Sequence, residues 1–349
     1  MPAESYSKKN ENNNPSPRAD WEVAIIIVAY EGDAWIPDCI ESLKASTQIN
    51  ALVLLIDNKN NTKLISGEIG SLTIHSFKTP HPMGFADANN FALMKVPSSV
   101  PNICFLNQDT LSQKNWLEEG LNCLHQNPQL GAVSPMLKNY QGTDWDKEFQ
   151  FLLKNQPDFE SDWLNCSDRR SVAKIHLVDD IPATAMIVKT EVIKRSGPFD
   201  NIFGSYYEDF DLCMRIRKSG YHVAVSPQSI LFHYSGSISQ TKEARRKRSR
   251  WVIRNRTVLK IRSSQGPRWL KAWRHLIING SLQTLRAILR TPSSSPLRSV
   301  ALAHIDLIGI LPRLCSCKID KKKWDQFLEE INWESFATQH HSLNENFTH

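Results

Sequence analysis

The chain has 349 residues, of which 41% are hydrophobic and 22% charged, and its net charge is +6. This composition is that of an ordinary globular protein, and the length allows one large α/β domain with a smaller appendage. The seven cysteines are scattered, without a C-x-x-C motif, which argues against a disulfide framework and for a reducing compartment. Cys315 and Cys317 have no second Cys/His pair nearby to complete a zinc site.

Residues 1–20 are polar and rich in Asn, Ser and Pro. They lack the apolar core of a signal peptide and predict a disordered tail. No segment approaches the roughly 20 apolar residues that span a bilayer. We therefore expect a cytoplasmic protein, and attachment to the inner face of the plasma membrane stays open.

From residue 21 onward, apolar strands alternate with amphipathic helices. Continuous apolar runs at Val23–Tyr30, Ala51–Asn58 and Asn102–Asp109 are typical of parallel strands buried on both faces. Other strands are expected at Leu72–Phe77, Gly131–Leu137, His222–Pro227 and Ser229–Ser235, with helices at Ile36–Ser46, Ala86–Met94, Trp116–Gln126 and from Glu208 to a stop at Gly220. Residues 181–197 predict a strand followed by a short helix that ends at Gly197 and Pro198. The alternation predicts a mostly parallel, doubly wound α/β sheet flanked by helices.

Two regions depart from this alternation. Lys138–Lys174 has weak periodicity and predicts a long loop or insertion. Beyond Gln240 the chain is basic: Lys242–Arg274 contains a single acid, Glu243, among interleaved tryptophans. Residues 240–349 are expected to form a basic, largely helical C-terminal region, interrupted by a turn at Thr291–Pro296.

Acidic and amide side chains follow two of the predicted strands. Asp57 and Asn58 end one strand, and Asn107 and Asp109 end another. Ligands of open α/β sheets bind at the carboxyl ends of the strands, where an Asn-x-Asp pair places two side chains on the same face. Such oxygen ligands suit a divalent cation that also binds a diphosphate. Asp57 alone is also compatible with a helix cap.

Three acids open the helix that begins at Glu208. Glu208, Asp209 and Asp211 follow a loop containing Tyr206 and Tyr207. Acids in a first helical turn are favoured by the helix dipole, but three beside so many aromatic residues exceed what capping requires. His233, at the end of the last predicted strand, is either a buried structural histidine or a metal ligand.

The motifs GFADANN, LNQDT, IPATAMIVKTEVIKRSGPFDNIFGSYYEDFDLCMRIRKSGY and HYSGS, followed by RNR at 254–256, occur in this order. Over residues 21–262 the chain resembles the inverting family 2 glycosyltransferases, particularly the bacterial rhamnosyltransferase-like branch. The resemblance implies a GT-A fold with a catalytic domain at 21–239. It also implies transfer from a nucleotide-sugar donor, dTDP-rhamnose or a UDP-sugar, to a hydroxyl of a glycan or lipid-linked acceptor, with inversion, in cell-surface polysaccharide synthesis.

The resemblance also implies roles for individual residues. The metal, Mg²⁺ or Mn²⁺, would be held by Asp109 and His233, and Asp209 would be the general base, with Glu208 beside it. The acceptor would contact Asp211 and Tyr207. The donor would be bound by Ala29, Tyr30, Asp57, Asn89, Asn90 and Asn107.

Two motifs depart from the family pattern. The stretch Asp57–Asn61 lacks the final acid of D-N-x-S-x-D, and Asn107–Asp109 contains one acid where two are frequent. We therefore expect weak metal binding, or binding that needs the donor.

Other readings compete with transferase activity. A nucleotidyltransferase would have a Gly-rich basic loop after the first strand, and a Rossmann dehydrogenase would have G-x-G-x-x-G there. The loop AYEGDAWIP has neither. A degenerate transferase that only binds membranes or glycans remains the alternative. The tract 242–274 suits anionic lipid head groups, or packing on the catalytic domain, better than nucleic acid.

Overall fold

The computed structural model describes residues 21–59, 61–147, 149–150, 175–234, 242–263 and 294–316, together with Leu270 and Arg274. The predicted N-terminal tail, most of the 138–174 loop and residues 235–237 of the HYSGS motif lie outside this set. So do Trp269 and Trp273 of the basic tract.

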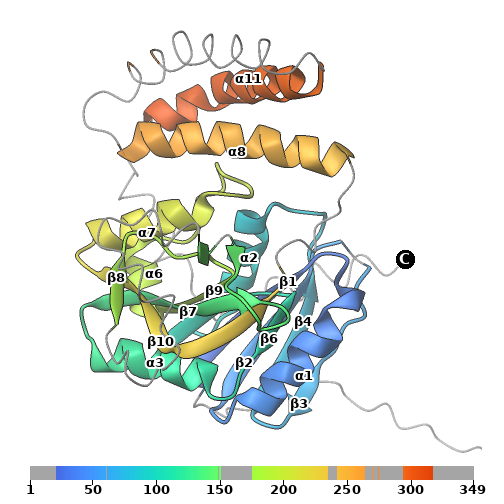
Figure 1. Cartoon of the computed structure of the whole chain (residues 1–349), viewed down its shortest axis with the longest axis vertical. Helices are drawn as coiled ribbons and strands as arrows, with labels where there is room; N and C mark the ends of the chain where they lie inside the picture. Colours follow the sequence, from blue (N-terminus) through green and yellow to red (C-terminus); the bar gives the residue numbers. More distant parts are fainter. Residues whose placement is uncertain are drawn as a thin grey trace, which may run out of the picture.

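A single ten-stranded sheet forms the centre of the protein (Figure 1). Its strand order is β3-β4-β2-β1-β5-β9-β7-β10-β6, with β8 paired to β10. The strands are β1 Val23–Ala29, β2 Ala51–Asp57, β3 Gly67–Ile69, β4 Leu72–Lys78, β5 Asn102–Asn107, β6 Thr110–Ser112, β7 Leu130–Asn139, β8 His176–Val178, β9 Ala185–Lys189 and β10 His222–His233.

The strand directions bring several strand ends to one edge of the sheet. Strands β4, β2, β1 and β5 are parallel. Strand β9 is antiparallel to both β5 and β7, so β7 runs in the direction of β5, and β10 is parallel to β7. The carboxyl ends of β1, β2, β5, β7 and β10 therefore lie at the same edge, where ligands of open α/β sheets bind.

The helices of the sheet domain agree with the sequence pattern. A 3-10 turn, η1, at Gly32–Ala34 follows β1. The α-helices are α1 Ile36–Ser46, α2 Phe85–Leu93, α3 Trp116–Gln126, α6 Thr190–Ser196 and α7 Glu208–Lys218. Because helices cover the sheet, every residue of β2 is buried, as expected for a strand enclosed on both faces. The predicted α/β fold, a mostly parallel sheet flanked by helices, is confirmed.

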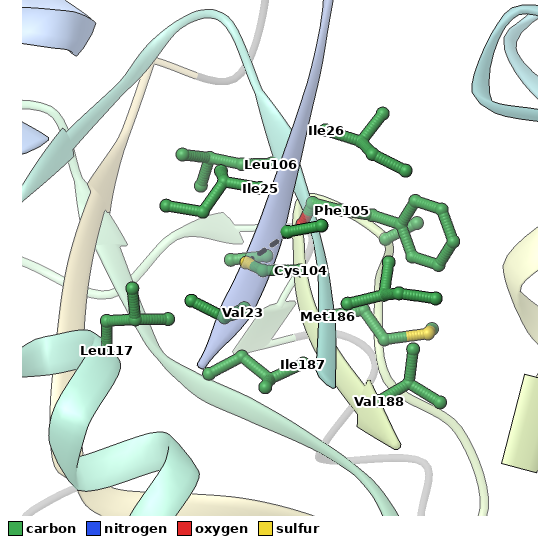
Figure 2. Close-up of a cluster of buried hydrophobic side chains, with 14 of the residues drawn as sticks. Val23, Ile25, Ile26, Cys104, Phe105, Leu106, Leu117, Met186, Ile187 and Val188 are labelled. Carbon is green, nitrogen blue, oxygen red and sulfur yellow. Dashed lines mark hydrogen bonds between the residues drawn. The ribbon is translucent and has the colours of Figure 1, made fainter. Parts of the chain in front are cut away.

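The main core joins β1, β5 and β9, three adjacent strands (Figure 2). Ile25, Phe105 and Ile187 come from these three strands and are fully buried. Their close packing fixes the relative positions of the strands, and hence of the loops at the carboxyl edge.

Three details differ from the sequence prediction. The two closing strands are one continuous strand, β10, whose pairing with β7 shifts register between Ser226 and Ile230. Pro227 lies within this irregularity, and a proline cannot donate a ladder hydrogen bond. The short strands β3, β6 and β8 were not predicted because they are too short to show a period. Residues 294–296 of the predicted turn form the start of a helix.

Two long helices follow the sheet domain and lie side by side (Figure 1). They are α8 Lys242–Ser263 and α11 Ser294–Ser316. A second apolar cluster joins Val258 and Ile261 of α8 and Leu307 of α11 to Ile202 and Phe203 of the sheet domain. None of the described helices has the length and apolar character needed to cross a membrane.

Candidate active site at the carboxyl edge of the sheet

Asp109 and His233 meet where β5 and β10 end. Both side chains are more than nine-tenths buried, and Nε2 of His233 lies 3.6 Å from Oδ1 of Asp109. The backbone N–H of Tyr234 donates to the Asp109 carbonyl at 3.0 Å, which ties the two strand ends together. The structure thus brings together the two residues expected to bind metal.

A third residue, Asp146, lies behind the histidine. Its Oδ2 is 3.1 Å from Nδ1 of His233, and its Oδ1 accepts the N–H of Phe149. Asp146 is buried, in the turn that follows β7. Sequence reasoning missed it because it lies in a segment read as a long loop. Its one signal is the position of an acid soon after a strand that ends at the carboxyl edge.

The two carboxylates control the charge of His233. Burial alone would lower the pKa of the imidazole. The hydrogen bonds and negative charges of Asp109 and Asp146 overcome this effect and raise the pKa of His233 to about 9. Without a metal, His233 is therefore an imidazolium between two carboxylates at neutral pH.

The same arrangement fits a divalent cation. A metal-binding histidine usually donates its other ring N–H to a carboxylate, as Nδ1 of His233 can to Asp146. Nε2 and the Asp109 oxygen would then be the two protein ligands, and a metal would compete with the proton on Nε2. Within the described part of the chain, no group of three or more His, Cys, Asp or Glu side chains is placed to hold a metal. The remaining ligands would therefore be donor oxygens or water.

Gln108, between Asn107 and Asp109, joins the ends of β5 and β1. Its Nε2 donates to the Tyr30 carbonyl and its Oε1 accepts the Tyr30 N–H, both at 2.9 Å. This pair of hydrogen bonds holds the backbone from which the Tyr30 ring, 44% exposed, projects. Ala29 before it is buried, and Asn107 is half-buried. Gln108 is thus a fixed part of the loop structure.

Asp57 occupies the end of β2, but its carboxylate faces its own loop. It is fully buried and accepts hydrogen bonds from the backbone N–H groups of Lys59, Asn61 and Thr62 at 3.2 to 3.4 Å. In this structure Asp57 shapes the loop, and its predicted contact with the donor stays a prediction.

Asn89 and Asn90 are also engaged within the protein. The Asn89 amide donates to the Phe85 carbonyl one turn earlier in α2. The Asn90 amide donates to the Phe199 carbonyl at 2.7 Å and accepts the Phe199 N–H at 3.2 Å. In this structure the two amides support α2 and the loop after α6, and their predicted contacts with the donor stay predictions.

Asp209 lies close to the tip of β5. Its Oδ2 accepts the backbone N–H of Ala183 at 3.3 Å. The next residue, Thr184, accepts the N–H of Asn107 at 2.8 Å. The expected base and the expected metal ligands therefore approach the same strand end from different parts of the chain.

The carboxyl groups around Asp209 retain protons unusually well. Burial, together with the charge of Asp209, raises the pKa of Glu208 well above its ordinary value. Its Oε2 has no hydrogen-bond partner among the described residues. Burial also raises the pKa of Asp180 to about 7, with Asp209 and Asp179 contributing in the same direction and Arg217 opposing them. Sequence reasoning missed Asp180, although an acidic pair precedes the IPATAM motif.

Asp211 has a structural role in this structure, and its predicted contact with the acceptor stays a prediction. It is 1% exposed and accepts hydrogen bonds from Arg215 and Arg262, both at 2.8 Å. Arg262 belongs to α8 and also pairs with Asp200 at 2.6 Å. Asp211, the third acid of the motif, thus anchors α8 to α7. Tyr207, the other expected acceptor contact, precedes α7 with a positive φ of 71°.

Three aromatic rings gather beside the Asp109–His233 pair. The Trp35 ring lies 4.5 Å from that of Tyr234 and 6.2 Å from that of Tyr140, measured between centroids. All three residues follow strand ends at the carboxyl edge, and Tyr234 is 45% exposed. They border the site on the side of β7 and β10.

Comparisons with known proteins found similar solved structures and one matching family model. Among solved structures, the mannosyltransferase PcManGT from Pyrobaculum calidifontis, in complex with GDP-Man and Mn²⁺, is similar with 14% identity and a TM-score of 0.49, covering 89% of this chain and 92% of that one. Residues 1–349 of S. aureus TarS, in complex with UDP-GlcNAc, give 13% identity and a TM-score of 0.48, covering 93% and 92%. No curated protein matches.

The family model described as Glycosyl transferase family group 2 matches residues 103–313. This span is more than half of the 349-residue chain. It contains Asp109, Asp209 and His233. The chain therefore belongs to glycosyl transferase family group 2.

Proposed function

We propose that this protein transfers a sugar from a nucleotide-sugar donor, dTDP-rhamnose or a UDP-sugar, to a hydroxyl of a glycan or lipid-linked acceptor. The transfer proceeds with inversion, in cell-surface polysaccharide synthesis. The observation that carries the proposal is the approach of Asp209 to the β5 tip through Ala183, at the same strand end as the Asp109–His233 pair.

In this reaction the acceptor oxygen forms a bond to the anomeric carbon while the bond from that carbon to the diphosphate oxygen breaks. The carboxylate of Asp209 accepts the proton of the acceptor hydroxyl. Such a base contributes on the order of 10²–10⁴-fold to the rate. A divalent cation, Mg²⁺ or Mn²⁺, when held by Asp109 and His233, would stabilise the negative charge of the leaving diphosphate.

The other residues of the site bind and orient. The exposed Tyr30 ring suits stacking with the donor base, and Gln108 fixes the backbone that carries it. Burial and the charge of Asp209 raise the pKa of Glu208 well above its ordinary value, which favours a neutral carboxyl beside the proposed base. A catalytically degenerate transferase that only binds membrane or glycan is the alternative. Retention of the buried Asp109, Asp146 and His233 together favours the enzyme.

A donor screen by thermal shift tests the proposal. UDP-, dTDP- and GDP-sugars are added with and without Mn²⁺. One donor should raise the melting temperature only with Mn²⁺, because the proposed cation binds both the protein and the donor diphosphate. A ligand at 100 times its Kd stabilises a protein by about 2.7 kcal/mol, which is enough to detect. Asp109→Ala should lose the Mn²⁺-dependent part. No shift with any donor, or the same shift without Mn²⁺, would contradict the proposed site.

The proposal includes a cytoplasmic location with peripheral contact to anionic lipids through residues 242–274. On α8, Arg246, Lys247, Arg256 and Lys260 are exposed. Each basic residue near an anionic leaflet contributes about 1 kcal/mol. Sedimentation with vesicles of phosphatidylserine and phosphatidylcholine should show salt-sensitive binding. Equal binding to vesicles of phosphatidylcholine alone would contradict the contact.

A further inference from the structure

The backbone before α7 has an unusual conformation. Tyr206 and Tyr207 both have positive φ, 72° and 71°. Non-glycine residues rarely adopt this left-handed region, and two in succession persist only when surrounding contacts hold them. The next two residues are Glu208 and Asp209, so the conformation of this loop determines where the proposed base lies.

One amide group from α8 holds the loop. Nδ2 of Asn255 lies 2.8, 2.8 and 2.7 Å from the carbonyl oxygens of Phe203, Ser205 and Tyr206, so its two N–H groups serve three acceptors and one N–H is shared. Asn255 is fully buried, and its Oδ1 accepts Nε of Arg254 at 2.8 Å. The arginine donor requires the amide oxygen on its side, which leaves the NH₂ group facing the three carbonyls.

The neighbouring residue strengthens the attachment. Nη2 of Arg254 donates to the carbonyls of Ile202 and Phe203, at 3.0 and 2.7 Å. Val258, one turn further along α8, packs on the same two residues within the second apolar cluster. The polar and apolar contacts of α8 thus converge on the loop.

The opposite side of the loop rests on the N-terminus of α2. The N–H of Ala86 donates to the Gly204 carbonyl at 2.8 Å, and the N–H of Phe85 donates to Oγ of Ser205 at 3.0 Å. A Cβ on Gly84 would lie 2.6 Å from the Gly204 carbonyl oxygen, so the approach depends on glycine. The loop is therefore clamped between the GFADANN segment and α8.

We propose that Asn255 is a positioning residue for sugar transfer: by holding three carbonyls of residues 203–206, it fixes the start of α7 and thereby the place of Asp209. This inference rests on the proposed role of Asp209 as base. It makes α8 a part of the catalytic apparatus. The same helix then serves the reaction through its buried face, whatever its exposed basic face contacts.

Asn255→Asp tests the proposal because it keeps the shape of the side chain and removes both N–H donors. The first readout is hydrogen exchange of the Ala86 amide in the protein without ligands. This amide donates to Gly204, so its exchange reports the position of the loop without reference to any activity. Exchange should become at least about tenfold faster in Asn255→Asp, and unchanged exchange would overturn the inference.

The second readout is the release of nucleoside diphosphate from UDP-, dTDP- and GDP-sugars with Mn²⁺. The kcat of Asn255→Asp should fall by about 10²-fold, since a displacement of about 1 Å costs that much. The KM for the donor should stay within about twofold, because the hydrogen bonds of Asn255 go to Arg254 and to the loop at residues 203–206. An unchanged kcat, or a rise in KM alone, would overturn the inference.

Asp306→Ala, on the neighbouring helix α11, is the matched control. It removes the ion pair of α11 with Arg250 of α8 and lies outside the tract proposed to contact lipids. This variant should lower the stability of the protein and leave kcat unchanged. A loss of kcat equal to that of Asn255→Asp would show that any loosening of α8 slows the reaction. That result would overturn the specific role of Asn255. If Asn255→Asp does not fold, Asn255→Ser, which keeps one donor, carries the same test. Wild-type protein that releases no diphosphate would contradict the proposed function, and exchange at Ala86 would then decide on the Asn255 contacts.

Discussion

Nδ1 of His233 lies 3.1 Å from Oδ2 of Asp146, 87 positions earlier in the chain. The bond joins the end of β10 to the turn after β7, and it leaves Nε2 directed toward Asp109. It fixes which ring nitrogen is offered to a ligand. Asp146 thus controls both the charge and the orientation of the expected metal-binding histidine.

Asp146→Asn should lower the pKa of His233 from about 9 toward 6.5 in the protein without metal, because one of the two stabilising charges is removed. Titration of the imidazole by NMR measures this directly. The affinity for Mn²⁺ should fall by about 10–100-fold, as is usual when a histidine loses its orienting partner. Asp144→Asn, an exposed neighbour, is the control. An unchanged pKa of His233 would contradict the assigned contact.

Asp211→Ala should lower the free energy of unfolding by about 3–5 kcal/mol, because Arg215 and Arg262 would lose a buried partner. Urea unfolding measures the change. The matched control is Asp179→Ala, whose ion pair with Arg217 is 49% exposed at the aspartate, and it should cost less than about 1 kcal/mol. If Asp211→Ala retained full stability and lost only affinity for the acceptor, the result would contradict the structural role and support the predicted contact with the acceptor.

Gly84→Ala should destabilise the protein by about 1–3 kcal/mol, because its Cβ would lie 2.6 Å from the Gly204 carbonyl oxygen. Gly309→Ala on α11 is a matched substitution where, among the described residues and apart from its own stretch of helix, nothing lies within 4 Å of the added Cβ. Alanine is the better helix former, so this control should stabilise by about 0.5–1 kcal/mol. Thermal unfolding separates the two, and a Gly84→Ala protein as stable as wild type would contradict the close approach of α2 to the loop.

The buried carboxyl of Asp180 should make stability depend on pH. Its pKa rises from 3.8 to about 7 on folding, so its contribution is fully present below 3.8 and is lost as the pH rises through about 7. Asn at this position stays neutral. The melting temperature of Asp180→Asn, relative to wild type, should therefore increase between pH 4 and pH 8. A difference that is constant with pH would show that Asp180 is not buried as a neutral acid.

The strands and helices of the sheet domain were predictable because they depend on local apolar patterns. Helices α1 and α3 match their predicted bounds, and β1, β2 and β5 match to within two residues. Residues that follow those strands were expected at one edge, and Asp109 and His233 do meet there. The alternation of strands and helices predicts parallel strands, so the carboxyl edge was the most predictable part of the site.

The partners of polar side chains were not predictable. Asp57, Asn90 and Asp211 stand in motifs that suggested ligands, yet their polar atoms bond to backbone or arginine within the protein. Asn90 and Phe199 are 109 positions apart, and no local period reports such a pairing. Asp146 and Asn255 were missed for the same reason, since each acts on a residue far away in the sequence. Sequence shows which groups stand near an edge, whereas packing decides which of them face inward.

Asp209→Asn tests most directly whether Asp209 is the base of sugar transfer. The rate of nucleoside diphosphate release and sugar transfer is compared in wild type, Asp209→Asn and Glu191→Gln, a control in the first turn of α6. Donor affinity is measured on the same proteins by calorimetry. We expect the rate of Asp209→Asn to fall by about 10²–10⁴-fold with unchanged donor affinity, while Glu191→Gln behaves as wild type. Full activity in Asp209→Asn would contradict its role as the base.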